Sequence, residues 1–448
     1  MTNLHTSEAV TGTGDRSRPR AALPALCATQ ITSWGIVYYA FPVLNPQITA
    51  ATHWSATATT AAFSGGLLVS ALTGIPVGRI LDRRGPRAVM STGSVLGVVA
   101  VLAIAYAPNL AVFTAAWLLA GVAMASTFYQ PAFAVLTRWW GEDRVRALTV
   151  VTLAGGLAST AFAPFTATLA EHLSWRTTYA VLAVILALVT IPAHALALRG
   201  PWPPAPVSAA QRGANSSSVT FSRPFLMLAA ALTLNSFAMY AVVIALVPLL
   251  IARGASCTAA AWVLGLGGVG QTLGRTLYAT LARRTGVTTR TVALIALGGT
   301  TTAAFAMVSG PFPLLVGIAI AAGMVRGNLT LLQATAVTDR WGTTHYGRLS
   351  GLLAAPATIA SALAPFAGAA LAGPLGGYPS LFMALALTSV AAALFAAGGA
   401  PSRRQRRRRP KRQGAVRPGL RSRADRSGHC SAPGSHGGVA GGAGRRRR

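Results

Sequence analysis

The chain has 448 residues, of which 53% are hydrophobic and only 10% are charged, and its mean hydropathy is +0.53. Soluble globular proteins carry about 25% charged residues, so this composition excludes an ordinary soluble enzyme and predicts an integral membrane protein. The formal net charge of +30 is unevenly distributed, because residues 401–448 hold 16 basic residues and one acidic residue. Three scattered cysteines exclude a disulfide framework.

Twelve stretches of the sequence are long and apolar enough to cross a bilayer, which requires about 20 residues of helix. Such runs must be helical, because no water satisfies the backbone there and barrel strands would be short and alternating. The sequence therefore predicts an all-α membrane protein with 12 transmembrane helices. The predicted spans are 22–43, 58–81, 88–107, 110–136, 147–170, 177–198, 224–251, 259–281, 291–309, 313–337, 349–372 and 379–398.

Arginine is concentrated in the loops on one side of the predicted helices. Only Arg176 and Arg253 fall on the other side. Because cytoplasmic loops are enriched in basic residues, we expect a multi-pass protein of the cytoplasmic membrane with both termini in the cytoplasm. The arginines of the expected cytoplasmic side are Arg16, Arg18, Arg20, Arg83, Arg84, Arg87, Arg138, Arg144, Arg146, Arg199, Arg212, Arg223, Arg283, Arg284, Arg290, Arg340 and Arg348.

A polar stretch rich in proline, serine and alanine divides the spans into six and six. This central cytoplasmic linker covers residues 199–222. It separates an N-terminal half at 22–198 from a C-terminal half at 223–398. A cytoplasmic segment at 1–21 and a disordered basic tail at 399–448 complete the predicted organisation.

The two halves share sequence features at an offset near 200 residues, which predicts two six-helix pseudo-repeats. Such repeats place a binding site near the bilayer midplane between the halves, and their rocking gives alternating access. The recurring features are Gly74, Leu81, Arg83 and Arg84 with Gly274, Leu281, Arg283 and Arg284; Trp140-Gly141 with Trp341-Gly342; and Ala163-Pro164-Phe165 with Ala364-Pro365-Phe366.

The loop from Gly78 to Arg87 resembles the signature loop of the major facilitator superfamily, although Pro86 stands where a basic residue is usual. This resemblance covers about residues 20–400 and implies the major facilitator fold and a transport function. It also implies a conformational latch in which Asp82 meets the start of the eleventh span and a neighbouring arginine. The alternative is that these are ordinary loop charges that set the topology. The predicted latch residues are Gly78, Asp82, Arg83, Gly85 and Arg87.

Arg275 and Arg326 fall near the midplane of the eighth and tenth predicted spans. A charge there costs about 2.5 kcal/mol or more unless it faces a wet cavity or a partner. No Asp or Glu lies inside any predicted span, so we expect the partner to be an anionic substrate, which a guanidinium can hold through two hydrogen bonds. The alternative is that each arginine bonds to backbone carbonyls of neighbouring helices.

Other polar and aromatic residues share helix faces with these arginines or lie in spans expected to line the cavity. Gly274-Arg275 and the first-span segment from Ser33 to Tyr39 are similar to monocarboxylate and oxalate/formate carriers, although Gln271 stands where monocarboxylate carriers often have an acid. This similarity implies a monocarboxylate substrate. The predicted substrate-binding residues are Trp34, Tyr38, Gln130, Asn235, Tyr240, Gln271, Arg275, Arg326 and Gln333.

Two glycine patterns predict close helix packing rather than ligand binding. Residues 265–270 match a dinucleotide fingerprint, but neither a preceding strand nor a following acid is present. Gly66, Ser70, Gly74 and Gly78 recur at every fourth residue, which suits packing of membrane helices.

We therefore expect a secondary transporter for a small organic anion, with no cofactor, no metal site and no enzymatic activity. The expected partners are the substrate and the lipid bilayer, with contact between the basic tail and anionic lipids. Nucleic acid is not expected, because the tail has no aromatic residues to stack on bases, and the protein is expected to be a monomer. Two alternatives remain: efflux of neutral or amphipathic compounds, and a transporter-like membrane sensor.

Overall fold

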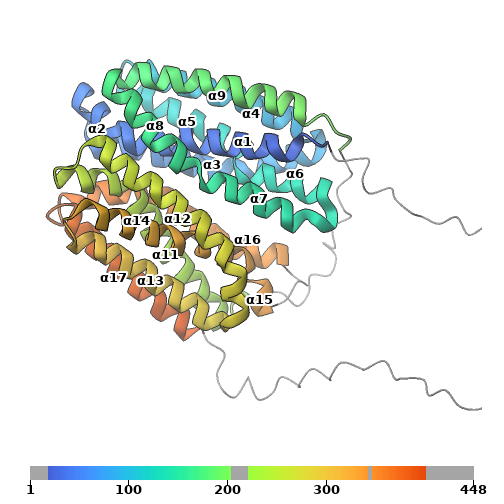
Figure 1. Cartoon of the computed structure of the whole chain (residues 1–448). Helices are drawn as coiled ribbons and strands as arrows, with labels where there is room; N and C mark the ends of the chain where they lie inside the picture. The colour runs from blue at the N-terminus through green and yellow to red at the C-terminus, as the bar shows by residue number, and fades with distance from the viewer. Residues whose placement is uncertain (1–18, 203–219, 342–345, 400–448) are drawn as a thin grey trace, which may run out of the picture. The chain divides into compact units, whose positions relative to one another are not determined.

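The computed structural model describes residues 19–202, 220–341 and 346–399, and all regular structure in these residues is helical. Successive helices are joined by short connections and form two groups, coloured blue to green and yellow to red in Figure 1. The first group contains α1 (Ala22–Trp34), the π-helical turn η1 (Gly35–Tyr39), α2 (Ala40–Thr52), α3 (Ala56–Arg84), α4 (Pro86–Ala105), α5 (Leu110–Thr127), α6 (Tyr129–Trp140), the 3-10 turn η2 (Gly141–Asp143), α7 (Arg144–Gly156), α8 (Ala158–His172) and α9 (Trp175–Ala197). The second group contains α11 (Arg223–Ala252), α12 (Cys257–Arg284), α13 (Val287–Met307), α14 (Phe312–Thr335), α15 (Thr338–Trp341), α16 (Tyr346–Ala372) and α17 (Tyr378–Gly398).

Within the described residues, ten helices are long and apolar enough to cross a membrane, and they correspond to ten of the twelve predicted spans. The first and eighth predicted spans are also helical, through α1–η1–α2 and through α12, but they are not among the ten. These two segments carry buried polar side chains such as Gln30, Asn45, Gln271 and Arg275. Burial inside the protein makes such residues tolerable where contact with lipid would not.

Parts of the predicted organisation fall on residues that the structure does not describe. These are residues 1–18 of the N-terminal segment, residues 203–219 of the linker and residues 400–448 of the tail. The expected contact between the tail and anionic lipids lies with them.

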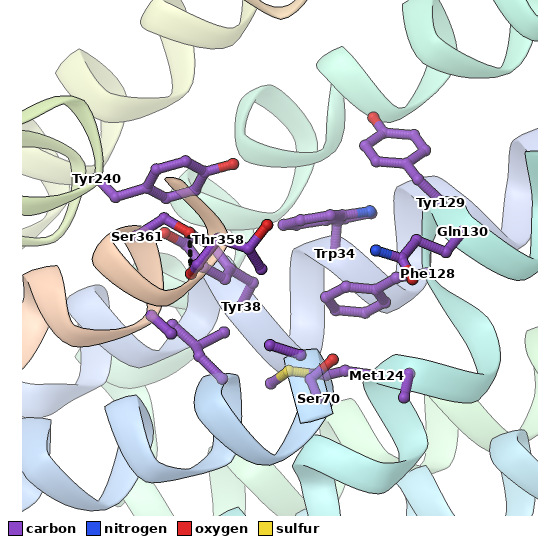
Figure 2. A pocket seen from close by; sticks show the side chains of 14 residues that line it. Trp34, Tyr38, Ser70, Met124, Phe128, Tyr129, Gln130, Tyr240, Thr358 and Ser361 are labelled. Carbon is purple, nitrogen blue, oxygen red and sulfur yellow. Dashed lines mark hydrogen bonds between the residues drawn. The ribbon is translucent and has the colours of Figure 1, made fainter. Parts of the chain in front are cut away.

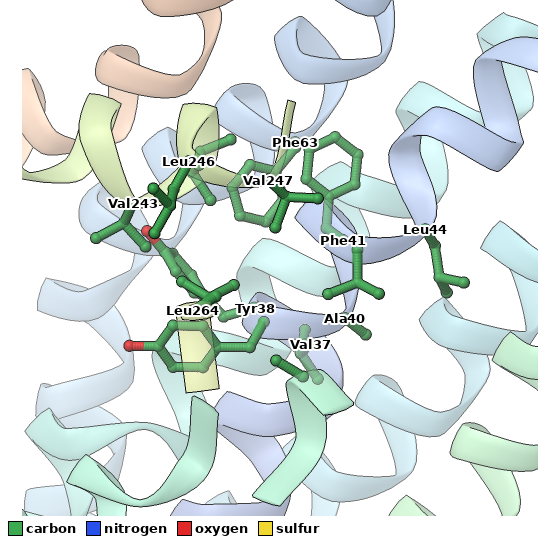
Figure 3. Packing of buried hydrophobic residues seen from close by; sticks show 14 of the residues in the cluster. Val37, Tyr38, Ala40, Phe41, Leu44, Phe63, Val243, Leu246, Val247 and Leu264 are labelled. Atoms are coloured by element: carbon green, nitrogen blue, oxygen red, sulfur yellow. The ribbon is translucent and has the colours of Figure 1, made fainter. Parts of the chain in front are cut away.

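The two helix groups share one apolar core at the end of the molecule remote from most of the arginines. There, Phe41 and Phe63 of the first group lie in the same buried cluster as Leu246 and Val247 of α11 and Leu264 of α12 (Figure 3). Phe41 and Phe63 stack with their ring centroids 4.4 Å apart. The packing at this end leaves one small cavity of about 20 Å³ among the described residues, between Asn45 and Thr60 of the first group and Pro248 and Tyr378 of the second.

At the arginine-rich end each group has a core of its own. One cluster draws only on the first group and includes Leu26, Met90 and Leu136, while the other draws only on the second group and includes Leu228 and Leu332. The groups are therefore joined at one end and have separate cores at the other.

Hydrogen bonds reinforce the junction between the groups at the joined end. Thr160 in α8 donates to the Gly265 carbonyl of α12 at 2.8 Å, and the backbone N–H of Phe366 in α16 donates to Ser64 Oγ of α3 at 3.0 Å. Thr258 also donates to the Glu171 carboxylate.

Arg253 and Arg176, at the end opposite the arginine-rich one, bind helix termini. Arg253 donates to the Phe305, Ala306 and Val308 carbonyls at the end of α13, and Arg176 donates to the Ala107 carbonyl after α4. The last carbonyls of a helix have no partner within it, and a cation there also complements the helix dipole. These two charges are therefore engaged in stabilising helix ends.

Glycines bring α12 and α14 into direct backbone contact. A Cβ atom on Gly323 would lie 1.9 Å from the Gly267 carbonyl oxygen, and one on Gly270 would lie 2.1 Å from the Ile320 carbonyl oxygen. The predicted packing role of segment 265–270 is therefore confirmed. In the second pattern, Gly66 contacts the backbone of Trp117, whereas Gly78 has no neighbour within 4 Å, so the packing prediction is correct at Gly66 and wrong at Gly78.

We expect Gly323→Ala to destabilise the protein by about 1–3 kcal/mol, because the new methyl group would force two helix backbones apart. Thermal unfolding of the purified protein in detergent measures this change. Gly317→Ala on the same helix is the matched control, because its Cβ atom would meet nothing within 4 Å. Equal unfolding temperatures for the two variants would contradict the close helix contact.

Candidate functional site

A cavity lies between the two helix groups and has two adjoining parts of about 250 and 380 Å³. Both parts are lined by Gln130, Tyr240, Thr358 and Ser361, which shows that they are continuous. The lining of the second part extends to Phe133, Leu232 and Ser350, which belong to the arginine-rich ends of their helices. The cavity therefore lies between the shared apolar core and the arginine-rich end, toward which it extends.

Five predicted substrate-binding residues line this central cavity. Trp34 and Tyr38 come from α1 and η1, Gln130 from α6, Tyr240 from α11 and Gln333 from α14. The Gln333 amide donates to Ser236 Oγ at 3.1 Å. Spans one, four, seven and ten thus contribute to the lining of this cavity.

A local break in helical regularity positions the aromatic lining. η1 is a π-helical turn, a feature that often occurs at functional sites. Gly35 allows the close packing of this turn, because a Cβ atom there would lie 2.2 Å from the Phe162 ring. The Trp34 ring stacks on Phe128 with centroids 4.2 Å apart, and Tyr38 meets Tyr240 edge-on at 6.4 Å (Figure 2).

Several lining residues were missed by the sequence analysis. Phe128 and Tyr129 flank the junction between α5 and α6, and α16 contributes a polar stripe with Ser350, Thr358 and Ser361. Small polar residues at helical spacing in an otherwise apolar span were a usable signal for α16. The junction at Phe128 has no comparable signal, because it interrupts a continuous apolar segment.

Two polar atoms in the cavity wall are buried without a hydrogen-bond partner in the part of the chain that the structure describes. They are the indole Nε1 of Trp34 and the hydroxyl of Tyr38. An indole N–H can only donate, and a phenol can donate or accept. These two groups are therefore buried within the wall with their hydrogen-bonding capacity unused.

Arg326 and Asn235 do not line the central cavity but a smaller one of about 50 Å³ inside the second helix group. The Arg326 side chain makes no hydrogen bond or ion pair to any described residue, and its Nε is buried. The smaller cavity shares no lining residue with the central cavity, and Arg326 lines the smaller one.

Arg275 lies apart from both cavities and crosses from one helix group to the other. Its side chain is 5% exposed, and its guanidinium donates to the Thr152 carbonyl of α7, while its Nε is buried without a partner among the described residues. A Cβ atom on Gly156 would lie 3.0 Å from Nη1 of Arg275, so a glycine beside the end of α7 makes room for the guanidinium. This is the arrangement that the structural alternative for Arg275 describes.

Gln271, one turn before Arg275, is also outside the cavity linings. It is buried, and its backbone carbonyl contacts Gly327 of α14. Gln271, Arg275 and Tyr278 share a buried face of α12, and this face contacts neighbouring helices rather than a cavity.

The predicted latch residue Asp82 forms an ion pair at 2.5 Å with Arg138 at the end of α6. Trp202 donates its indole N–H to the Asp82 carbonyl at 3.2 Å, and the Arg138 guanidinium lies 4.5 Å from the centroid of the Trp202 ring. Residues 342–345, which precede α16, lie outside the described part of the chain. The predicted meeting of Asp82 with the start of the eleventh span stays a prediction.

The other predicted latch residues surround this ion pair without joining it. Gly85 ends α3 with φ 78°, a conformation that favours glycine, and Arg87 donates to the Ala195 carbonyl at 3.0 Å. Arg83 is exposed, and Gly78 borders open space.

No group of three or more His, Cys, Asp or Glu side chains among the described residues could hold a metal ion.

A family model described as the Major Facilitator Superfamily matches residues 26–311 and 228–432. Because these matches cover more than half of the chain, the protein belongs to the major facilitator superfamily. It is a multi-pass membrane transporter rather than an enzyme.

Among curated proteins, the chain is similar to monocarboxylate transporter 13 of Rattus norvegicus, with 27% identity over 368 residues and 79% of each chain covered. It is also similar to the uncharacterized MFS-type transporter YcxA of Bacillus subtilis (strain 168), with 26% identity over 126 residues, covering 28% of this chain and 31% of that protein.

Two solved structures share the fold. A bacterial homologue of the human lysosomal transporter Spinster, in an inward-facing and occupied conformation, has a TM-score of 0.65 and 16% identity and covers 86% of this chain and 97% of its own. The nucleoside transporter NupG has a TM-score of 0.67 and 14% identity and covers 84% of this chain and 98% of its own.

The two intramembrane arginines should respond oppositely to neutralisation in the absence of ligand. We expect Arg275→Gln to destabilise the protein by about 1–3 kcal/mol, because the Thr152 carbonyl loses a charged donor. We expect Arg326→Gln to leave stability unchanged or to raise it, because a buried charge without a partner is removed. Thermal unfolding of both variants in detergent measures the difference, and a larger loss for Arg326→Gln would contradict these assignments.

Proposed function

We propose that this protein is a secondary active transporter that moves a small organic anion, with a monocarboxylate as the favoured substrate, across the cytoplasmic membrane by alternating access. One observation carries the proposal: the region of the two cavities contains cationic charge and unused donors but no carboxylate among the described lining residues. A cation in the membrane interior needs a counter-charge, which an anionic substrate supplies.

The charge near the cavities favours a carboxylate over a cation. Trp34, Tyr38 and Asn235 have polar atoms without partners, and Arg326 adds a planar guanidinium that suits a carboxylate. A cationic substrate would be repelled by Arg326.

The similarity to monocarboxylate transporter 13 of Rattus norvegicus supports the same substrate class. In this proposal Arg326 supplies the positive charge, and Arg275 keeps its contact with the Thr152 carbonyl. Gln271 stands where monocarboxylate carriers often have an acid, so the proton of a symport mechanism would have to travel with the substrate.

The direction in which the cavity extends supports a cytoplasm-facing state. Basic loops lie on the cytoplasmic side of membrane proteins, and the cavity extends toward the arginine-rich end. Rocking of the two helix groups would separate the core around Phe41 and Val247 and close the cytoplasmic ends. The Asp82–Arg138 ion pair would then hold the signature loop against α6 as the groups move.

A second candidate is export of neutral or amphipathic compounds, which the aromatic wall formed by Trp34, Phe128, Tyr129, Phe133 and Tyr240 favours. In that case both arginines would be structural. The hypothesis of a membrane sensor relies on the basic tail, which lies outside the described residues.

The substrate class can be tested by ligand-dependent thermal stability of the purified protein in detergent. The panel contains small carboxylates, their neutral amides, sugars and lipophilic cations. We expect stabilisation by at least one carboxylate, of about 2.7 kcal/mol at 100 times its Kd, and none by the matching amide.

Counterflow of the same carboxylate in proteoliposomes distinguishes transport from binding alone. Stabilisation by neutral or cationic compounds only would overturn the proposal in favour of export. Binding without counterflow would instead favour the sensor.

A further inference from the structure

We propose that Gln30 of α1 is a positioning residue for the central cavity. It fixes the break between α5 and α6, and this break turns Gln130 into the cavity as a polar contact for the substrate. The inference rests on the proposed function and adds which residue contacts the substrate and which residue places it there. Gln30 itself is 0% exposed and lines neither part of the cavity.

The break between α5 and α6 consists of one extended residue. α5 ends at Thr127 and α6 begins at Tyr129, while Phe128 between them has φ −76° and ψ −162°. In a continuous helix the Thr127 carbonyl would accept the N–H of residue 131. That residue is Pro131, which has no N–H, so the carbonyl needs a donor from elsewhere.

Gln30 supplies this donor from a helix 97 residues earlier in the chain, because its amide nitrogen donates to the Thr127 carbonyl at 2.7 Å. One turn further along α1, the Trp34 ring stacks on Phe128. A proline alone does not end a helix in this protein, since Pro164 lies inside α8. The hydrogen bond and the stacked ring from α1 therefore hold the break in place.

The break decides whether Gln130 reaches the cavity. Met124 and Ala125, near the end of α5, line its first part. Successive residues of an α-helix differ in direction by about 100°, so in an unbroken helix Gln130 would point at least about 120° away from both of them. Instead, Phe128, Tyr129 and Gln130 all line the same cavity. The break thus adds to the wall a residue that helical periodicity would exclude.

Gln130 lies where the two parts of the central cavity meet. It is exposed, lines both parts and makes no hydrogen bond to any described residue. Figure 2 shows its side chain directed from α6 toward Trp34. The neighbouring hydroxyls of Thr358 and Ser361 instead donate to carbonyls of their own helix, at 2.9 and 2.8 Å. The Gln130 amide is therefore the group at this position that can donate to a carboxylate.

Thiol labelling of the full-length protein in detergent tests the positioning without any substrate. Gln130→Cys is reacted with sulfonatoethyl methanethiosulfonate, and the rate at residue 130 is read by mass spectrometry, because the native cysteines remain. Adding Gln30→Met keeps the length of the side chain but removes the donor. We expect this second change to slow labelling at residue 130 by about tenfold or more.

Ser361→Cys is the matched control, because it lines the same cavity from α16, a helix that the break does not include. We expect Gln30→Met to change its labelling by less than about threefold. Equal slowing at both positions would show a general loss of structure and overturn the inference.

A second variant separates positioning from stability. Gln30→Met combined with Pro131→Ala returns a backbone N–H to the Thr127 carbonyl, so we expect it to fold and to unfold at a higher temperature than Gln30→Met alone. It does not restore the break, and labelling at residue 130 should stay slow. Recovery of labelling together with stability would show that Gln30 contributes stability alone and would overturn the inference.

Binding tests the contact with the substrate. The probe is whichever of acetate and benzoate binds the unsubstituted protein more tightly. Gln130→Leu should weaken its binding by about tenfold or more, because a hydrogen bond to a charged group is lost. Gln30→Met should weaken it to the same extent, and the combined variant little further, because Gln30 acts through Gln130. Additive losses would contradict this coupling.

The outcomes separate this inference from the proposed function. If no carboxylate in the wider panel binds the unsubstituted protein, the proposed function fails, while labelling still decides whether Gln30 positions Gln130. If a carboxylate binds, and Gln30→Met changes neither its affinity nor the labelling at residue 130, the function stands and the inference is overturned.

Discussion

The central constraint on this structure is that a positive charge inside a bilayer must find a partner, because no water is available to solvate it. The two midplane arginines meet this constraint in different ways. Arg275 reaches across to the other helix group and bonds to a backbone carbonyl. Arg326 has no such partner among the described residues, and it lies beside a small cavity with an unpartnered amide. The same residue type therefore joins the groups at one position and borders a cavity within one group at the other.

This division depends on how closely α12 and α14 pack. Glycines such as Gly270 and Gly323 bring the two helix backbones into contact, which fixes the directions in which the neighbouring Arg275 and Arg326 project. Because the helices cannot slide without backbone collisions, Arg275 is directed toward α7 and Arg326 toward the cavity of the second group. Close packing thus gives different surroundings to two arginines that both fall near the middle of a predicted span.

The distribution of apolar contacts complements the charges. One shared core joins the helix groups on one side of the cavity, and two separate cores leave the arginine-rich end divided. The rocking motion of the proposed function would require the shared core to part while each group keeps its own core.

The sequence alone was sufficient to predict a helical membrane protein of the major facilitator superfamily, because apolar runs and the loop from Gly78 to Arg87 are local features. It also identified Trp34, Tyr38, Gln130, Tyr240 and Gln333, which fall on the cavity faces of their helices. Helical periodicity shows which residues share a face, but not what that face meets. Only the tertiary structure showed that Gln271 and Arg275 face neighbouring helices, that Arg326 and Asn235 share a separate cavity, and that Phe128, Tyr129 and the α16 stripe complete the wall. The reason is physical: helix rotation and the junction between α5 and α6 are set by packing between segments more than a hundred residues apart in the chain, as the contact from Arg275 to Thr152 shows.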